Sequence, residues 1–257
     1  MTLTCNSVAL RVPGRTLCSN LEFAVMPGEV WGVLGPNGSG KTTLLNTLAG
    51  LAVPADGSVT IDDQPLAAMN ALVRARAIGV LPQHEEGEFQ GTALDYVLLG
   101  RFPHAPAWRG WQRDDGAVAR TALDRVGMTA FAGRRYATLS GGERQRVRIA
   151  QLLAQAPRYL LLDEPLQHLD LRYQIQALDL MAALARDAGN RHGVVLVLHD
   201  VLWPARVCTH ALLLDGAGDA RAGAAHEVLT QANLEALFGC ALRPAGDRLG
   251  AGFVPAI

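Results

Sequence analysis

Hydrophobic positions recur along the chain with the two periods that distinguish strands from helices. Residues 3–25 alternate between apolar and polar side chains and turn at Pro13-Gly14, which is typical of an antiparallel sheet. Later apolar runs are short, and Val30–Leu34 and Tyr159–Leu162 indicate buried strands. Further short strands are expected at Ser58–Ile61, Ile78–Leu81, Gly193–Leu198 and Ala211–Leu214.

Helical patterns lie between these strands. We expect helices at residues 42–49, 66–76, 92–99 and 114–126, a long helix that ends near Ala156, and one or two short helices within 224–238. A further helix is expected to begin at Asp170, which would cap it, and to bury one apolar face: Leu171, Ile175, Leu178, Ala182 and Ala185.

The order of these patterns predicts one domain with an insert. Nothing between 91 and 157 has the character of a strand core, and 101–113 is expected to be irregular. We therefore expect a helical insert at 91–157 within an α/β frame made of 1–90 and 158–240. Residues 241–257 contain glycine and proline and are expected to form a short tail.

Composition narrows the class of protein. A chain of 257 residues with 49% apolar content can form one large α/β domain, and its net charge of −1 leaves no electrostatic footprint for bulk nucleic-acid binding. The four cysteines are scattered without the spacing of a zinc site or a disulfide framework. No apolar run approaches the roughly 18 residues that span a bilayer, and no signal peptide precedes the first strand. These features indicate a soluble chain, which could still dock on a membrane protein.

A glycine-rich segment carries the first chemical motif. Gly35–Thr43 fits G-x-x-x-x-G-K-[ST] and lies between an expected strand and an expected helix, as a phosphate-binding loop does. Its backbone N–H groups and the helix N-terminus would hold phosphate oxygens. The residues concerned are Gly35, Pro36, Asn37, Gly38, Ser39, Gly40, Lys41, Thr42 and Thr43.

The lysine of this loop is unusual in the chain. Lys41 is the only lysine, so the other 22 of the 23 basic residues are arginines. A compact ammonium fits between β- and γ-phosphates, whereas a guanidinium is planar and larger.

Two carboxylates end one of the buried strands. Asp163 would share a Mg²⁺ ion with Thr42, and Glu164 would orient and deprotonate a water beside the γ-phosphate. This pair favours hydrolysis of a nucleoside triphosphate over simple nucleotide binding.

A third motif precedes the long helix. Leu139-Ser-Gly-Gly-Glu-Arg-Gln145 places Ser140, Gly141, Gly142 and Glu143 at a second anion-binding helix start. One nucleotide has a single γ-phosphate, so a second phosphate-binding helix start suggests a head-to-tail dimer. In that dimer Ser140 would face the nucleotide held by the loop of a second copy.

With these motifs the sequence resembles the ATP-binding subunits of ABC transporters over roughly residues 3–235. The resemblance implies a phosphate-loop (RecA-like) ATPase core with an N-terminal antiparallel β subdomain and an inserted helical subdomain. It also implies roles for three single residues: Gln83 senses Mg²⁺ and links to the membrane subunit, Asp170 contacts the dimer partner, and His199 contacts the γ-phosphate. The aromatic residue that usually stacks on adenine near Val12 is missing, and Arg11 or Arg15 could stack instead.

Some segments are similar to those of importers of iron chelates, haem and cobalamin, among them Gly100–His104 and Leu198–Asp200. This resemblance implies a homodimer that uses ATP and Mg²⁺ on two transmembrane permease subunits, at the cytoplasmic face of the bacterial inner membrane, with a substrate-binding protein as an indirect partner. Haem is favoured as substrate. We expect His104, Trp108 and Trp111 to pack within an irregular loop rather than to bind haem.

Three other functions are compatible with parts of the pattern. An ABC exporter ATPase would share the motifs, and a soluble ABC-type clamp would act on nucleic acid or ribosomes without a membrane partner. A monomeric phosphate-loop kinase would leave Leu139–Gln145 without a purpose.

Overall fold

A mixed six-stranded sheet forms the centre of the computed structural model, which describes residues 2–85, 87–105, 111–112, 114–246 and 252–256. The strand order is β10-β9-β3-β8-β7-β6, and every pairing is parallel except that of β10 with β9. The strands are β3 (Val30–Leu34), β6 (Ile78–Leu81), β7 (Tyr159–Asp163), β8 (Gly193–Val197), β9 (His210–Leu214) and β10 (Ala220–Ala224). Parallel strands place all their carboxyl ends at one edge, where the predicted phosphate loop and the two carboxylates meet.

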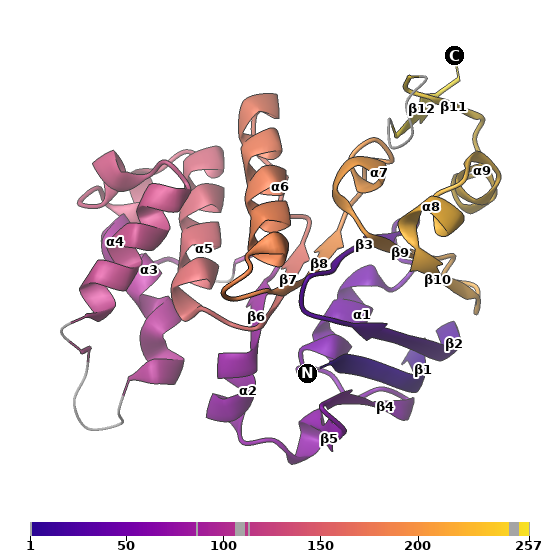
Figure 1. Ribbon diagram of the computed structural model, residues 1–257, viewed down its shortest axis with the longest axis horizontal. Helices are drawn as coiled ribbons and strands as arrows, with labels where there is room; N and C mark the ends of the chain where they lie inside the picture. The colour runs from indigo at the N-terminus through magenta and orange to yellow at the C-terminus, as the bar shows by residue number, and fades with distance from the viewer. Residues whose placement is uncertain (1, 86, 106–110, 113, 247–251, 257) are drawn as a thin grey trace.

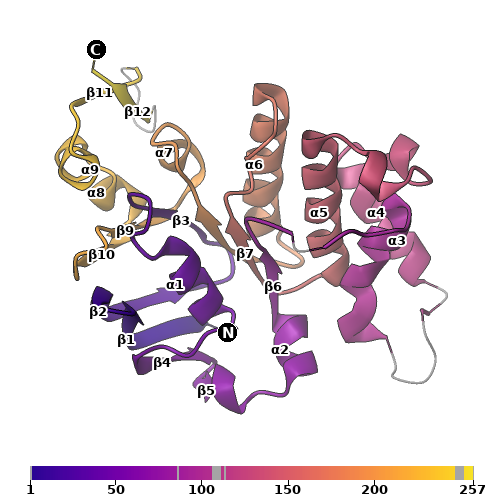
Figure 2. The same cartoon turned by 180° about the vertical axis from the view of Figure 1, so that it is seen from behind.

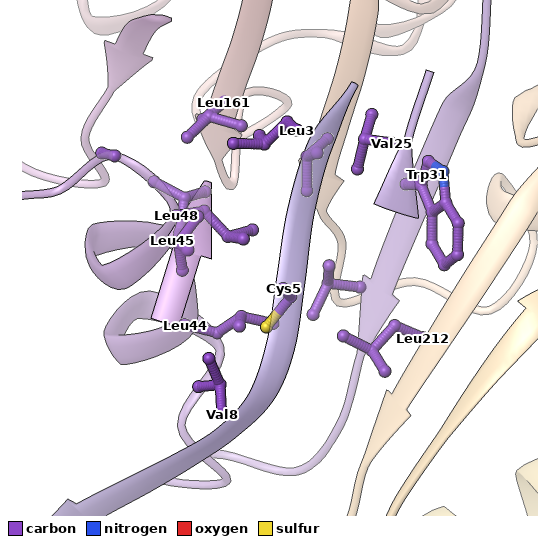
Figure 3. Packing of buried hydrophobic residues seen from close by; sticks show 14 of the residues in the cluster. Leu3, Cys5, Val8, Val25, Trp31, Leu44, Leu45, Leu48, Leu161 and Leu212 are labelled. Carbon is purple, nitrogen blue, oxygen red and sulfur yellow. The ribbon is translucent and has the colours of Figure 1, made fainter. Parts of the chain in front are cut away.

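A second, antiparallel sheet packs over one face of the first. Its order is β2 (Arg15–Val25), β1 (Leu3–Val12), β4 (Asp56–Ile61) and β5 (Gln64–Pro65). Helix α1 (Lys41–Leu48) lies between the sheets and contacts both β1 and β7. Figure 3 shows Leu44, Leu45 and Leu48 of α1 directed towards β1 and Leu161. The helix that follows the phosphate loop is therefore held from two sides.

A helical layer lies at one end of the molecule (Figure 1, Figure 2). It contains α3 (Ala93–Leu98), α4 (Asp115–Arg125) and α5 (Gly141–Gln155), with short 3-10 turns η2 (Leu99–His104), η3 (Thr129–Phe131) and η4 (Tyr136–Thr138). In both views α5 lies between α6 (Leu171–Arg186) and the other two helices. Its apolar residues belong both to the core of this layer and to the core under α6.

Helix α6 covers the opposite face of the central sheet, but not with the whole face that the sequence predicts. Leu178, Ala182 and Ala185 are buried as expected, whereas Leu171 is 63% exposed and Ile175 is 41% exposed. Full burial begins only at Ala177: in the first turns Tyr173 is partly buried and lies under the guanidinium of Arg146, whereas Leu171 and Ile175 are on the exposed side of the helix. The expected face was therefore wrong at its two N-terminal positions.

Several other elements differ from the expectation. The single helix predicted at 66–76 is two elements, η1 (Leu66–Ala68) and α2 (Ala71–Ala77), because the Asn70 side chain accepts the N–H of Leu72 and caps a new helix. The region 101–113 begins with η2 rather than an irregular chain.

The C-terminal part holds more structure than a tail. Within 241–257, β11 (Leu242–Pro244) pairs with β12 (Phe253–Pro255). The expected short helices are α8 (Ala225–Val228) and α9 (Gln231–Phe238), and α7 (Pro204–Val207) was not predicted. Among the described helices, none combines the length and apolar character needed to cross a bilayer.

Candidate nucleotide-binding site

The phosphate loop curls around its own lysine. Lys41 Nζ donates to the carbonyl oxygens of Gly35 and Pro36, at 2.8 and 2.9 Å, and the residue is only 7% exposed. A Cβ atom on Gly35 would lie 2.2 Å from the Leu214 carbonyl oxygen, so only glycine fits there. Burial lowers the pKa of Lys41, while the carboxylates of Glu164 and Asp163 raise it. The ammonium held here is therefore poorly solvated and suited to an anionic ligand.

Beneath the loop, Asp163 lies against Thr42. Thr42 Oγ1 donates to Asp163 Oδ2 at 2.7 Å, and Asp163 is 1% exposed. Its other oxygen, Oδ1, is buried without a hydrogen-bond partner among the described residues. Burial raises the pKa of Asp163 and the bond from Thr42 opposes that rise. An unpartnered carboxylate oxygen beside a hydroxyl fits a hard divalent cation such as Mg²⁺, for which oxygen atoms are the preferred ligands.

Glu164 follows directly and points its carboxylate into the site. Its φ is +50°, a left-handed conformation that is uncommon for a residue of this size and that occurs at functional sites. Oε1 is hydrogen-bonded to His199 Nε2, and Oε2 accepts from Gln167 Nε2. The residue is 8% exposed, so this carboxylate is held by two partners in a nearly enclosed position.

A cavity of about 680 Å³ joins these groups. The predicted residues that line it are Asn37, Gly38, Gly40, Lys41, Thr42, Thr43, Gln83, Glu164 and His199. Val12, Arg15, Leu17 and Gln167 line it as well. The structure therefore brings together the loop, Gln83, the base candidate and His199, which are far apart in sequence.

The start of β2 contributes Arg15 and Leu17 to the wall of the cavity. Arg15 donates from Nε and Nη2 to the Gly216 carbonyl oxygen, at 2.8 and 2.5 Å. Arg11 instead pairs with the exposed Asp56 at 2.7 Å and does not line the cavity. Of the two arginines that the sequence left open for adenine, only Arg15 lies at the site.

The motif at 139–145 does not contribute to this cavity. Ser140 Oγ accepts the N–H of Glu143 at 3.3 Å, and Glu143 Oε2 accepts the N–H of Ser140 at 2.7 Å, which makes a reciprocal cap on α5. Ser140 and Gly141 are exposed. A Cβ atom on Gly142 would lie 2.8 Å from the carbonyl oxygen of His168, so glycine lets the loop after Glu164 pass close to α5.

Asp170 occupies the N-cap position of α6, but its side chain makes no capping hydrogen bond, contrary to the expectation. The residue is exposed and does not line the cavity. Like Ser140 at the start of α5, Asp170 is therefore a polar residue exposed at a helix start.

Two buried side chains of α5 connect the loops that carry Gln83 and Glu164. Gln145 Nε2 donates to the Pro165 carbonyl oxygen at 3.0 Å. Arg148 Nη1 donates to Gln145 Oε1 at 2.8 Å, and Arg148 Nη2 donates to the carbonyl oxygen of Pro82. The position of α5 is thereby linked to both loops of the site.

Gln167 is the site residue that sequence reasoning missed. A single glutamine in a sequence does not indicate a catalytic role. The one feature that could have drawn attention to Gln167 is its distance along the chain from Glu164. It stands three residues after Glu164, and a turn, in which its N–H donates to the Glu164 carbonyl at 3.2 Å, brings the two side chains together.

The chain is similar in sequence and in structure to known proteins. The profile of the ABC transporter family matches residues 18–167. The chain is 39% identical over 249 residues to the hemin import ATP-binding protein HmuV of Bordetella avium (strain 197N), covering 93% of this chain and 92% of that protein. It is 43% identical over 218 residues to HmuV of Gloeobacter violaceus, covering 81% and 77%.

Solved structures share the fold over most of the chain. A metal-chelate type ABC transporter in an inward-facing conformation has a TM-score of 0.85 at 30% identity, covering 100% of this chain and 98% of that one. A dimeric bacterial ABC transporter cassette has a TM-score of 0.76 at 28% identity, covering 87% and 98%. The predicted fold class is confirmed by these similarities.

Proposed function

The chain belongs to the ABC transporter family as an ATP-binding subunit, and from that premise we propose that two copies of it power the import of haem through two membrane subunits. Such a subunit is an ATP hydrolase coupled to transport. The observation that carries the proposal is the meeting of Lys41, Glu164 and His199 in one cavity lined by a phosphate loop, with Asp163 buried beside it and bonded to Thr42.

ATP would lie with its phosphates along the loop and its γ-phosphate towards Glu164. Ser39 Oγ is buried without a hydrogen-bond partner in the described chain, and a phosphate oxygen held by the loop would supply one. Thr42, Asp163 and Gln83 would hold Mg²⁺, which when bound neutralises charge on the phosphate oxygens. Arg15 lies where the adenine end would reach the surface.

Hydrolysis needs a base beside the attacking water. Glu164 would accept one water proton while the water oxygen bonds to the γ-phosphorus. The bond from that phosphorus to the bridging oxygen breaks, and ADP leaves with the electron pair. His199 would contact the γ-phosphate and hold Oε1 of Glu164, and Lys41 would stabilise the charge that develops on the phosphoryl oxygens.

A second copy would complete the site. Ser140 and Gly141 are exposed at the capped start of α5 and do not line the nucleotide cavity of the described chain, and Asp170 is exposed as well. A similar cassette of known structure is dimeric. These observations support a head-to-tail homodimer in which each signature segment faces the nucleotide of the partner.

Docking on membrane subunits is supported by apolar side chains that the described chain leaves exposed on neighbouring segments. Arg76 Nε donates to the Pro103 carbonyl at 2.7 Å, and Arg74 packs on Gly50, so η2, α2 and the loop after α1 adjoin one another. The exposed residues on or near them are Leu51, Val53, Leu72, Val73, Phe102 and Trp111. We propose that 91–157 is the helical subdomain of the ATPase and that η2 contributes to this surface.

If the chain powers an importer, its other partners and its location are those of an importer subunit. The subunit would sit at the cytoplasmic face of the inner membrane, and a substrate-binding protein would deliver the ligand to the permease. Haem itself would not touch this chain: His104 Nε2 donates to the Gln155 carbonyl at 2.8 Å, and Trp111 packs on Phe102 with ring centroids 4.9 Å apart. Trp108 lies outside the described residues.

The test is hydrolysis in the complete complex. The subunit is co-purified with its membrane partners in lipid, and ATPase is measured with a haem-loaded, a ferric-siderophore-loaded and a cobalamin-loaded binding protein. We expect stimulation by haem and a loss of at least about 10²-fold in Glu164→Gln with ATP binding retained. Near-normal turnover of Glu164→Gln would remove Glu164 as the base. Stimulation by another ligand, or by nucleic acid without membrane subunits, would overturn the haem assignment.

A further inference from the structure

Gln167 contacts the carboxylate on which hydrolysis depends. Its Nε2 donates to Glu164 Oε2, while His199 is bonded to Oε1. The same three residues also line a second cavity of about 210 Å³, together with Gln174 and Trp203. They therefore form the wall between this cavity and the nucleotide cavity, and the Glu164 carboxylate is supported at both of its oxygens.

The backbone around Gln167 is fixed on both sides. Leu169 is buried in the core under α6, and its N–H donates to the Leu166 carbonyl at 3.3 Å. Gln145 of α5 donates to the Pro165 carbonyl at 3.0 Å. Gln167 thus projects from a short, anchored turn, so its amide has a defined position relative to Glu164.

The Glu164 carboxylate needs such support. Its backbone is left-handed, with φ at +50°, and the last torsion of a glutamate is broad, so the chain alone does not fix where the two oxygens point. A general base must lie within hydrogen-bond reach of the water it deprotonates. Each carboxylate oxygen has two lone-pair positions, so a donor on each oxygen fixes the group and still leaves a position for water.

We propose that Gln167 is a positioning residue for ATP hydrolysis, which holds Oε2 of Glu164 while His199 holds Oε1. The proposal rests on the function proposed above, in which Glu164 is the base. The role requires an N–H donor: a glutamate of the same size at this position would place a second carboxylate against Glu164 and repel it.

The test compares three substitutions in the full-length chain. Gln167→Met removes the donor at similar volume, and Gln167→Glu keeps the shape but reverses the interaction. The matched control is Gln174→Met, because Gln174 lies on the second cavity but donates to the Leu169 carbonyl instead. We expect kcat to fall about tenfold or more in both Gln167 variants, with KM and the ATP Kd within about twofold of the parent, and no change in the control.

A double variant separates positioning from general damage. In the Glu164→Gln background, measured by slow single turnover, Gln167→Met should cause no further loss, because the carboxylate it positions is gone. An equal loss in both backgrounds, or a kcat of Gln167→Met within about twofold of the parent, would overturn the role. If the unmodified chain hydrolyses no ATP, the proposed function fails first. If it hydrolyses ATP and Gln167→Met does so equally well, only this inference fails.

Discussion

Replacing Asp163 with asparagine should stabilise the nucleotide-free protein while removing the Mg²⁺-dependent part of its stabilisation by Mg-ATP. The carboxylate is buried, receives one described hydrogen bond, from Thr42 at 2.7 Å, and has one oxygen with no described partner. The amide of asparagine carries no charge to desolvate, and its oxygen can still accept the Thr42 hydroxyl. The negative charge that would bind a cation therefore lowers the stability of the protein when no cation is bound.

The size of the effect follows from this geometry. Asparagine removes the cost of burying a charged carboxylate and adds the smaller cost of burying an amide NH₂ group. The difference should raise the free energy of unfolding by about 1–2 kcal/mol at neutral pH. The pH dependence has a definite sign. Burial raises the pKa of Asp163, so the parent fold loses stability as pH rises from the unfolded pKa, about 4, through the folded pKa. Asparagine should remove that loss.

Urea unfolding with and without Mg-ATP measures both effects. At 100 times Kd the nucleotide should stabilise the parent by about 2.7 kcal/mol, and the variant should lose the part of this stabilisation that EDTA removes from the parent. Asp170→Asn is the control, since Asp170 is exposed and should change the empty protein by less than about 0.5 kcal/mol. An empty Asp163→Asn protein less stable than the parent, or one equally stabilised by Mg-ATP, would refute the reasoning.

Three further predictions test other parts of the structure. An amine-reactive probe should label only the N-terminus and Lys41, and Mg-ATP should suppress labelling at Lys41, as peptide mass mapping would show; unchanged labelling with nucleotide would contradict the phosphate loop. Gly142→Ala should lower the free energy of unfolding by about 1–3 kcal/mol, because its Cβ would lie 2.8 Å from the His168 carbonyl, and an unchanged urea midpoint would argue against that close approach. Leu178→Ala should destabilise the fold by about 2–5 kcal/mol and Ile175→Ala by less than about 0.5 kcal/mol, and similar losses in both would mean that α6 buries the face first predicted.

The elements that the sequence predicted well are those in which local signals agree. The strand Val30–Leu34, the glycines after it and the helix from Lys41 all point to one strand–loop–helix unit, and the structure has it. The start of the long helix at Ser140 was also predicted from local signals, and Glu143, three residues later, completes a cap there that was not predicted. Such features depend on neighbours in sequence and need no knowledge of the rest of the fold.

What the sequence could not supply depends on distant packing. The periodicity of Leu171 and Ile175 is correct for α6, but which of its turns are buried depends on neighbours that are distant in sequence. Arg11 and Arg15 are equivalent in sequence, and the Gly216 carbonyl, 201 residues away, distinguishes them. The role of Gln167 requires the position of its amide relative to Glu164, which no spacing rule fixes.

The contacts of α5 with the two loops have a consequence for the order in which parts of the chain can fold. Arg148 lies 66 residues after Pro82, whose carbonyl it binds, and Gln145 lies 20 residues before Pro165. During synthesis the loop with Pro82 and Gln83 therefore leaves the ribosome well before Arg148, which donates to it. The loop with Pro165 leaves the ribosome after Gln145, which donates to it. We therefore expect both loops to take their final positions only once α5 has formed, so that in pulsed hydrogen exchange during refolding the amides beside Pro82 should gain protection no earlier than those of α5.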